Sequence, residues 1–531
     1  MRLNSKQKNN FFWFFLIPTL ILITLTISLS PWAFELLSTP PDRFFTGINR
    51  FSTDYFIYLS YVEIGRRGDI LAKLLINTIP QKGIFAHTVH TLGGFIFGHL
   101  FNLSSPVSYH LTRGFWSLVF LLSVILFFYK ISLSKKVTAL AFFLTFFISG
   151  FAKIISLKPL QADLYLSWLQ EQNIIGRASG PIHYNAGFVF FILSFLWFFS
   201  AQTFSWKKTL VFGLLLNLCL NSNPFAYLIL ILSFGLYIVF KLFFLKQKLH
   251  ELKKEILFLF LGFLSSLPLL LYNQKFLSLE PWGKYGMSPK FYVINHPPLP
   301  FFDTIFSIGP IFFLGIAGIV VFLFKKKGNW LNTHIFMIAW LLCQFILFFF
   351  GDVLKIHPLR AFSGLYYLPL VFFSALLLQQ FFNKKLIVIC LLLFLITLPG
   401  YYLAYRQQLF AFTDFKNYSL FTFPTKKQGD GFSFMEKNLP SGKGVLALYE
   451  ASSLIPALSG CATELDMSHE LKSKFYNKEM NEKQAYEFLK ENNFSYVYFG
   501  YQEKYYGREF EKYPFIKKVF HNEEVDVYQI L

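Results

Sequence analysis

The stretch FTGINRFSTDYFIYLSYVEIGRRGD, residues 45–69, is dense in charged residues although it lies between long apolar segments. These charged residues are Arg50, Asp54, Glu63, Arg66, Arg67 and Asp69. Charges beside a membrane are costly and usually have a function or a partner. Tyr55, Tyr58 and Tyr61 recur every three residues, so they share one side of a helix and suit a membrane–water interface. We expect a short helix on the bilayer surface with Asp54 at its start; an interfacial loop with solvated charges is the alternative.

The composition indicates a polytopic membrane protein. The chain has 531 residues, of which 54% are hydrophobic and only 15% charged, and its mean hydropathy is +0.47. A soluble protein of this size could not cover so much apolar surface. The net charge of +20 does not indicate a nucleic-acid partner, because the basic residues cluster in short loops between apolar segments. The four cysteines are expected to be free thiols.

About eleven stretches come close to the roughly 20 apolar residues of a membrane-spanning helix. They are Phe11 to Ser30, Gly114 to Tyr129, Val137 to Ile155, Ala186 to Phe199, Leu210 to Leu220, Phe225 to Phe240, Ile256 to Tyr272, Phe301 to Phe324, His334 to Phe350, Phe362 to Gln380 and Leu386 to Leu403. The short fifth stretch ends at NSNP, residues 221–224, where Pro224 can start the next helix and an asparagine can cap it.

The loops between these stretches predict the orientation. With a cytoplasmic N-terminus, the lysine-rich loops all fall on the cytoplasmic side. The chain is therefore expected in the cell membrane, multi-pass, with its C-terminal part outside. Residues 83–100, which contain three histidines and four glycines, are expected as an interfacial or re-entrant helix; were they a true span, the downstream topology would invert.

The fold class expected from these patterns is mainly α, a membrane domain of about eleven spans followed by a small extracytoplasmic α/β domain. The membrane domain covers residues 1–412 and contains a long first extracytoplasmic loop, residues 31–113. Residues 413–430 are expected to form a linker, and residues 431–531 alternate between helix and strand patterns. A tail of this size can bury its own core and is expected to fold separately.

Carboxylates in the outer loops are the candidates for chemistry. A carboxylate near the membrane surface can act as general base for an acceptor hydroxyl, because partial desolvation raises its pKa. Asp54 is the first candidate and Glu63 the second. In the second outer loop, Asp163 and Glu171 are eight residues apart, so they would share one face of a helix. With Asp54, this pair could complete an acid–base site or a site for Mg²⁺ or Mn²⁺, with Asp54 and Asp163 as metal ligands.

Cationic residues at the outer surface are candidates for binding a lipid phosphate. The segment DVLKIHPLRAFSG brings Lys355, His357 and Arg360 together, and arginine offers a bidentate donor that lysine lacks. Arg360 is therefore the first candidate, and snorkelling to lipid headgroups is its alternative role. Arg113 at the start of the second span and His183 at the start of the fourth are further candidates.

These features together resemble the GT-C class of multi-spanning glycosyltransferases. The similarity is carried by DYFIYLS, residues 54–60, followed by IGRRGD, and by three stretches of the tail: VLALYEASSLIPALSG, FSYVYFG and VDVYQI. The sequence departs from the pattern at Cys461, where arginine is usual after the glycine, and at Asn223, where histidine is common.

The resemblance implies a transferase whose acidic residue in the first outer loop, here Asp54, acts on a sugar linked to polyprenyl phosphate. We therefore expect a membrane glycosyltransferase that works outside the cytoplasm, with membrane lipids and the lipid-linked donor as its partners. Two alternatives are a lipid or saccharide transporter, or flippase, and a non-catalytic scaffold. The transporter is disfavoured because no internal repeat and no charged residue in mid-span is found.

Overall fold

The computed structural model describes residues 15–48, 52–157, 160–166, 178, 180–200, 205–283, 300–325, 332–354, 358–361, 365–409, 421–506 and 510–531. The chain divides into two compact units. The membrane unit consists of residues 1–30, 113–275 and 287–407. The loop–tail unit consists of residues 31–112, 276–286 and 408–531. The first outer loop thus belongs with the tail, whereas the sequence placed it in a separate membrane domain.

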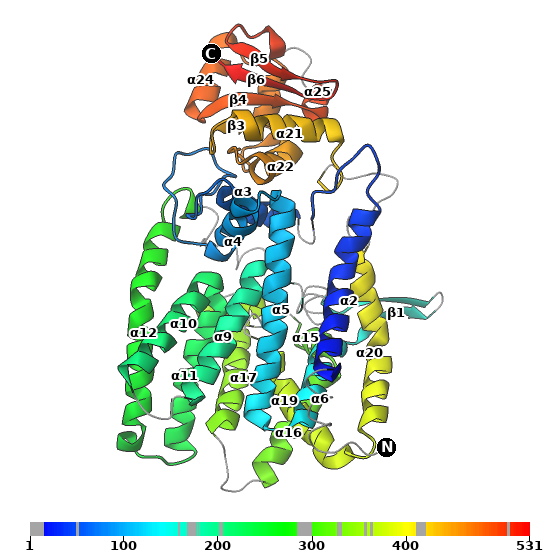
Figure 1. The fold of residues 1–531 in the computed structure, drawn as a ribbon, viewed down its shortest axis with the longest axis vertical. Helices are drawn as coiled ribbons and strands as arrows, with labels where there is room; N and C mark the ends of the chain where they lie inside the picture. The colour runs from blue at the N-terminus through cyan, green and yellow to red at the C-terminus, as the bar shows by residue number, and fades with distance from the viewer. Residues whose placement is uncertain are drawn as a thin grey trace. The chain divides into compact units, whose positions relative to one another are not determined.

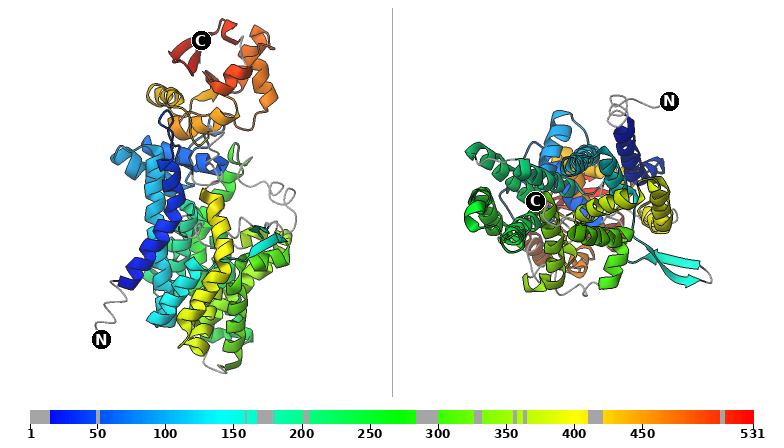
Figure 2. Two further views of the ribbon diagram at one scale, coloured as in Figure 1. Left: turned by 90° about the vertical axis from the view of Figure 1, so that its right-hand side faces the viewer. Right: turned by 90° about the horizontal axis from the view of Figure 1, so that it is seen from below.

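Each of the eleven predicted spans contains a helix. The helices are α2 (Ile17–Leu37), α5 (Ser105–Ser132), α6 (Lys135–Phe147), α9 (Ile182–Ser200), α10 (Trp206–Ser222), α11 (Pro224–Phe243), α12 (Leu249–Leu277), α15 (Phe301–Ile308) with α16 (Pro310–Lys325), α17 (Asn332–Phe350), α19 (Tyr367–Phe382) and α20 (Leu386–Leu409). Figures 1 and 2 show the long helices of the membrane unit running side by side. Helices suit lipid because every backbone polar group inside them is satisfied.

Fewer of these helices than predicted are long and apolar enough to cross a membrane. Within the described residues there are seven such helices, or eight if the bent pair α15 and α16 counts as one span. That pair bends by 89° at Gly309, whose φ is +77°. These helices support a multi-pass membrane protein, but they do not confirm the predicted count of eleven spans. Asn223 caps α11 as expected, since its side chain accepts a hydrogen bond from the Ala226 amide at 3.1 Å.

The third predicted span is wrong at its C-terminal end. Helix α6 has 13 residues, and the chain then forms strand β1 (Ala152–Leu157), which pairs antiparallel with β2 (Leu160–Leu164). The right-hand view of Figure 2 shows this hairpin extending away from the helices. The alternation of apolar and polar residues in LQADL, residues 160–164, suits this strand rather than the helix expected for the loop.

The first outer loop of the loop–tail unit is itself helical. Helix α3 (Ser52–Arg66) occupies the predicted position, and α4 (Thr88–Gly93) continues into the π-helical segment η2 (Gly94–Leu100). These helices pack closely because glycines line the contact. A Cβ on Gly65 would lie 2.0 Å from the Thr91 carbonyl oxygen, and one on Gly94 would lie 2.0 Å from that of Val62.

The tail contains a four-stranded sheet in the order β3-β4-β6-β5. Its strands are β3 (Gly444–Leu446), β4 (Phe494–Phe499), β5 (Ile516–His521) and β6 (Asp526–Ile530). Strands β3 and β4 are parallel, and the other pairs are antiparallel. Its helices are α21 (Lys426–Asn438), α22 (Tyr449–Ser459), α23 (His469–Tyr476), α24 (Glu482–Glu491) and the short α25 (Tyr501–Tyr506). Helix α21 starts inside the predicted linker, and α22 and α23 were not predicted.

Backbone hydrogen bonds join the tail to the first outer loop within the loop–tail unit. The Thr46 amide donates to the Thr422 carbonyl at 3.0 Å, and the Thr463 amide donates to the Leu75 carbonyl at 2.9 Å. The Thr78 hydroxyl donates to the Asn492 carbonyl at 2.7 Å. These bonds involve three separate stretches of the chain after residue 408, so the loop and the tail share one hydrogen-bonded framework.

Candidate functional site

Asp54 lies in the first turn of α3 and its side chain is exposed. An exposed carboxylate at a helix N-terminus is stabilised in its ionised form by the helix dipole. The rest of α3 is largely buried, because its other face packs against η2 and against α22 of the tail. The helix therefore presents an exposed carboxylate at one end of an otherwise buried element.

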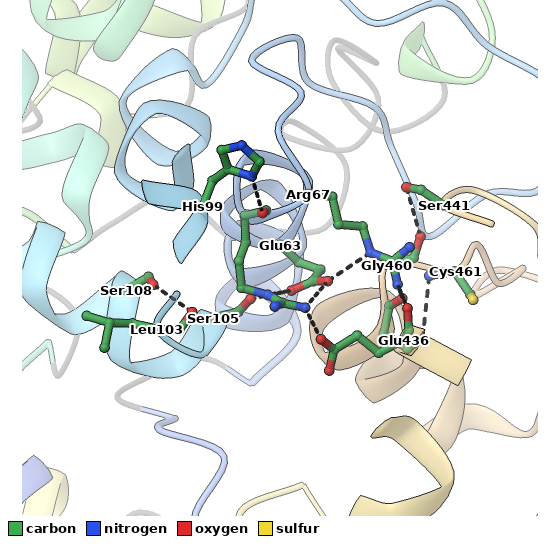
Figure 3. A network of polar contacts seen from close by, with 12 residues as sticks. Glu63, Arg67, His99, Leu103, Ser105, Ser108, Glu436, Ser441, Gly460 and Cys461 are labelled. Carbon is green, nitrogen blue, oxygen red and sulfur yellow. Dashed lines mark hydrogen bonds and ion pairs between the residues drawn. The ribbon is translucent and has the colours of Figure 1, made fainter. Parts of the chain in front are cut away.

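Glu63 is the centre of a network of polar contacts at the opposite end of α3 (Figure 3). Its carboxylate is 1% exposed and accepts hydrogen bonds from Arg66 Nε at 2.7 Å and from Arg67 Nε at 3.0 Å. The Ser105 hydroxyl also donates to it, and Arg66 pairs in addition with Glu436 on α21. Burial alone would lower the pKa of Arg66, but the ion pairs with Glu63 and Glu436 raise it above its usual value. The two predicted bases thus lie in very different surroundings: Asp54 is exposed, and Glu63 is buried and paired.

Arg67 connects the same network to the tail. Its guanidinium donates to the carbonyl oxygens of Glu436, at 2.8 Å, and Ser459. Gly460 allows this approach, because a Cβ there would lie 2.5 Å from Arg67 Nε. The buried Cys461 follows, and burial raises the pKa of its thiol to about 11, so it is a poor nucleophile.

Two of the three tyrosines of α3 are buried within the protein, whereas the sequence suggested that all three face a membrane–water interface. Tyr55 and Tyr61 are 3% and 2% exposed. Tyr61 stacks on His87 with 4.6 Å between ring centroids, and Tyr58 stacks on His90 at 5.0 Å. Burial lowers the pKa of His87 to about 4, so this ring is neutral at pH 7. The three-residue spacing of these tyrosines therefore marks an aromatic cluster packed on His87 and His90.

In the membrane unit, Arg360 lies beside the first turn of α9. Its Nη1 donates to the Tyr184 hydroxyl at 2.8 Å, and its guanidinium carbon is 5.0 Å from the centroid of the Phe225 ring. Arg360 belongs to the short helix α18 (Pro358–Ala361), which packs on α17. The side chain is therefore held by two aromatic residues from two different helices, α9 and α11.

His183 and Arg113 are associated with the same turn of α9. His183 is 8% exposed, and its ring centroid is 4.6 Å from that of Tyr184. Asn185 Nδ2 donates to the Ser117 hydroxyl at 3.2 Å, and that hydroxyl donates to the Arg113 carbonyl at 2.7 Å. Arg113 itself is fully buried in the membrane unit. Arg360 and His183 thus both contact Tyr184 at the start of α9, whereas Arg113 is connected to this turn through its backbone carbonyl.

Tyr184 and Asn185 make these links, and the sequence analysis did not select either of them. The available signal was the dense polar run HYN in residues 183–185 at the entry of an otherwise apolar helix. Lys355, His357 and Glu171 lie outside the described residues.

Asp163 does not have the position that the sequence predicted. It lies in strand β2, opposite Lys153 of β1, and its side chain is exposed. The argument that it shares a helical face with Glu171 is therefore wrong. Asp163 also belongs to the membrane unit, whereas Asp54 belongs to the loop–tail unit.

The described residues contain no group of three or more histidine, cysteine, aspartate or glutamate side chains arranged to hold a metal ion. Asp54 and Asp163, the metal ligands suggested by the sequence, do not form a common donor set within either unit. The sequence left the cofactor open, with a divalent cation as one option, and the described residues show no set of ligands for such a cation.

The tail contains a separate buried pair of titratable groups. Glu503 is 1% exposed and accepts hydrogen bonds from the amides of Leu448, at 2.7 Å, and Gly500, at 3.1 Å. Burial raises the pKa of Glu503 to about 7 and lowers that of Lys472 to about 8. Lys472 Nζ also donates a hydrogen bond to the hydroxyl of Ser452. Because Ser452 is fully buried, a substrate cannot reach this serine and lysine.

The fold is shared with solved structures of membrane glycosyltransferases, in agreement with the resemblance carried by the sequence motifs. No protein-family model and no curated protein matches the sequence, so the likeness is one of fold.

The solved structures with this fold include one archaeal enzyme and one mycobacterial enzyme. One is the oligosaccharyltransferase of Archaeoglobus fulgidus with a tethered acceptor peptide, which is 15% identical with a TM-score of 0.52; the match covers 92% of this chain and 70% of that one. A second structure of that enzyme, AglB, in complex with an inhibitory peptide and a dolichol-phosphate, is 14% identical over the same shares with a TM-score of 0.50. The mycobacterial arabinofuranosyltransferase AftD is 10% identical with a TM-score of 0.52, over 97% of this chain and 40% of AftD.

Proposed function

We propose that this chain is an integral membrane glycosyltransferase that transfers a sugar from a polyprenyl-phosphate donor to an extracytoplasmic glycan, lipid or protein. The observation that carries the proposal is Arg360, held by Tyr184 and Phe225 at the start of α9, in a fold shared with membrane glycosyltransferases. The dolichol-phosphate in one AglB structure supports a lipid-linked phosphate as the donor class.

Arg360 is assigned to the phosphate of the donor. A guanidinium binds two phosphate oxygens at once, and the N-terminus of α9 adds the positive end of a helix dipole. His183 and Tyr184 lie at the same turn and can donate further hydrogen bonds. Lys355, His357 and Arg113 stay as secondary candidates. Arg360, His183 and Tyr184 stabilise the negative charge that grows on the phosphate as the bond between the phosphate oxygen and the sugar C1 breaks.

Asp54 is assigned as the base that accepts the proton of the acceptor hydroxyl while its oxygen forms the new bond to C1. It is exposed at one end of a helix, whereas the carboxylate of Glu63 is 1% exposed and accepts hydrogen bonds from two arginines and Ser105, so an acceptor hydroxyl cannot reach it. Glu63 is therefore assigned to holding α3 in place. Asp163 and Glu171 receive no step in this mechanism.

The test is transfer of radiolabelled sugar from a polyprenyl-phosphate donor by the purified protein in detergent. Asp54→Asn keeps the shape of the side chain but removes the base, so the rate should fall by roughly 10²- to 10⁴-fold. Asp42→Asn is the matched control, because Asp42 is also an exposed aspartate of the first loop, with a long ion pair of 3.9 Å to Arg43. Equal rates in both variants would remove Asp54 from the mechanism. Movement of the lipid-linked sugar across vesicles without transfer would favour the transporter alternative.

A further inference from the structure

An apolar groove of about 480 Å³ lies on the membrane unit between α10 and α12. Trp206, Leu210 and Leu214 of α10 and Leu261 of α12 line it. Leu210 and Leu214 are 61% and 55% exposed. The volume is within the range of roughly 300–1,000 Å³ that is typical of sites for small ligands. The lining spans Trp206 to Asn217, which is about 16 Å along a helix and matches a long stretch of an acyl chain.

The groove exists because small residues hold the two helices together at its base. A Cβ on Gly213 would lie 2.0 Å from the Ser265 hydroxyl oxygen, so no larger residue fits there without displacing α12. Asn217 Nδ2 donates to the carbonyl oxygens of Gly213, at 2.9 Å, and Ser265, at 3.2 Å. The amide NH₂ group is thus satisfied inside the protein. What the groove offers to the membrane is mainly its leucines and the ring of Trp206.

One end of the groove carries positive charge. Lys207 and Lys208 follow Trp206 in the first turn of α10, and Lys207 Nζ is 5.7 Å from the centroid of the Trp206 ring. Trp206 is 68% exposed, as is usual for tryptophans at the membrane–water interface. The basic loops, this one included, are expected on the cytoplasmic side, where anionic lipids give the membrane surface a negative potential.

We propose that this groove binds an anionic phospholipid of the cytoplasmic leaflet, with an acyl chain along Leu210 and Leu214 and the phosphate at Lys207. Basic sites between membrane helices on that side bind anionic headgroups, and the apolar channel below the lysines distinguishes this site from a merely charged surface. The inference does not rest on the glycosyltransferase activity, and its test measures lipid binding rather than sugar transfer.

The experiment is native mass spectrometry of the purified full-length protein after titration with phosphatidylglycerol or phosphatidylcholine of the same chain length. We expect phosphatidylglycerol to be retained more strongly. Lys207→Gln should lower its retention about fivefold, since one lysine near the headgroups contributes about that much. Leu214→Trp should fill the groove and lower the retention of both lipids. Both altered side chains are solvent- or lipid-facing, so folding should be preserved; size-exclusion chromatography checks this.

The matched controls lie on α20, which also has a basic start and a lipid-facing leucine row. Lys385→Gln and Leu392→Trp change an exposed lysine and an exposed leucine there. They should leave retention unchanged. Equal retention of the two lipids would overturn the proposal. So would an equal loss in the α20 variants, because that result would indicate general attraction to basic helix ends.

Discussion

Glu63→Gln distinguishes a structural from a catalytic role for the most buried acid of the first loop. The substitution keeps the shape of the side chain but removes the charge that two arginines share. Removal of one partner of a buried ion pair costs about 3–5 kcal/mol. Here the cost should be smaller, about 2–3 kcal/mol, because Arg66 keeps Glu436 and Arg67 keeps its carbonyl acceptors. The arginine side chains are also 17% and 18% exposed, so water can reach them.

The measurement is the midpoint of thermal unfolding in detergent together with transfer activity. For a unit of roughly 200 residues, a loss of 2–3 kcal/mol lowers the midpoint by about 5–10 °C. Below that midpoint, the activity per folded molecule should stay close to the wild-type value. Glu436→Gln is the control, because Glu436 is more exposed and pairs with Arg66 alone among the contacts described here, and its midpoint should fall by less. An unchanged midpoint with activity reduced more than 100-fold would refute the structural assignment and make Glu63 the base.

Three further predictions concern the donor site, the tail and the topology. Arg360→Lys should lower kcat/KM for the donor about tenfold, because a cation stays but the bidentate contact to the departing phosphate is lost. Tyr184→Phe should have a weaker effect of the same kind, and an unchanged kcat/KM in Arg360→Lys would count against phosphate binding. Between its ordinary pKa of 4.5 and its raised pKa of about 7, Glu503 keeps its proton in the folded state but loses it in the unfolded state. The free energy of unfolding should therefore fall by up to about 3 kcal/mol as the pH rises through that window, and Glu503→Gln should lack this slope. Unfolding midpoints that change with pH in the same way in both proteins would contradict this role of Glu503. Cysteine labelling in intact cells should reach Glu470→Cys from outside but not Lys384→Cys, and labelling of both would show that a span has been miscounted.

Hydrogen bonding and periodicity explain which parts of the fold could be predicted. Long apolar runs must be helical in lipid whatever surrounds them, so all eleven helix positions could be predicted from residue type. Alternation likewise located β4 and β6, and the asparagine cap of α11 depends only on neighbouring residues. The end of α6 and the β1–β2 hairpin were missed because apolar β-branched residues suit a strand and a membrane helix equally well.

The sequence by itself determined that this is a multi-pass membrane protein, and it marked Asp54 and Arg360 as charged residues at helix starts outside the apolar runs. Only the tertiary structure decided which charges are already committed to partners. It shows Arg66 paired with Glu436, 370 residues away in the chain, and Arg360 held by Tyr184, 176 residues away. It also groups the first loop with the tail. The physical reason is that burial and ion pairing depend on contacts between distant segments, which local patterns of residue type do not encode.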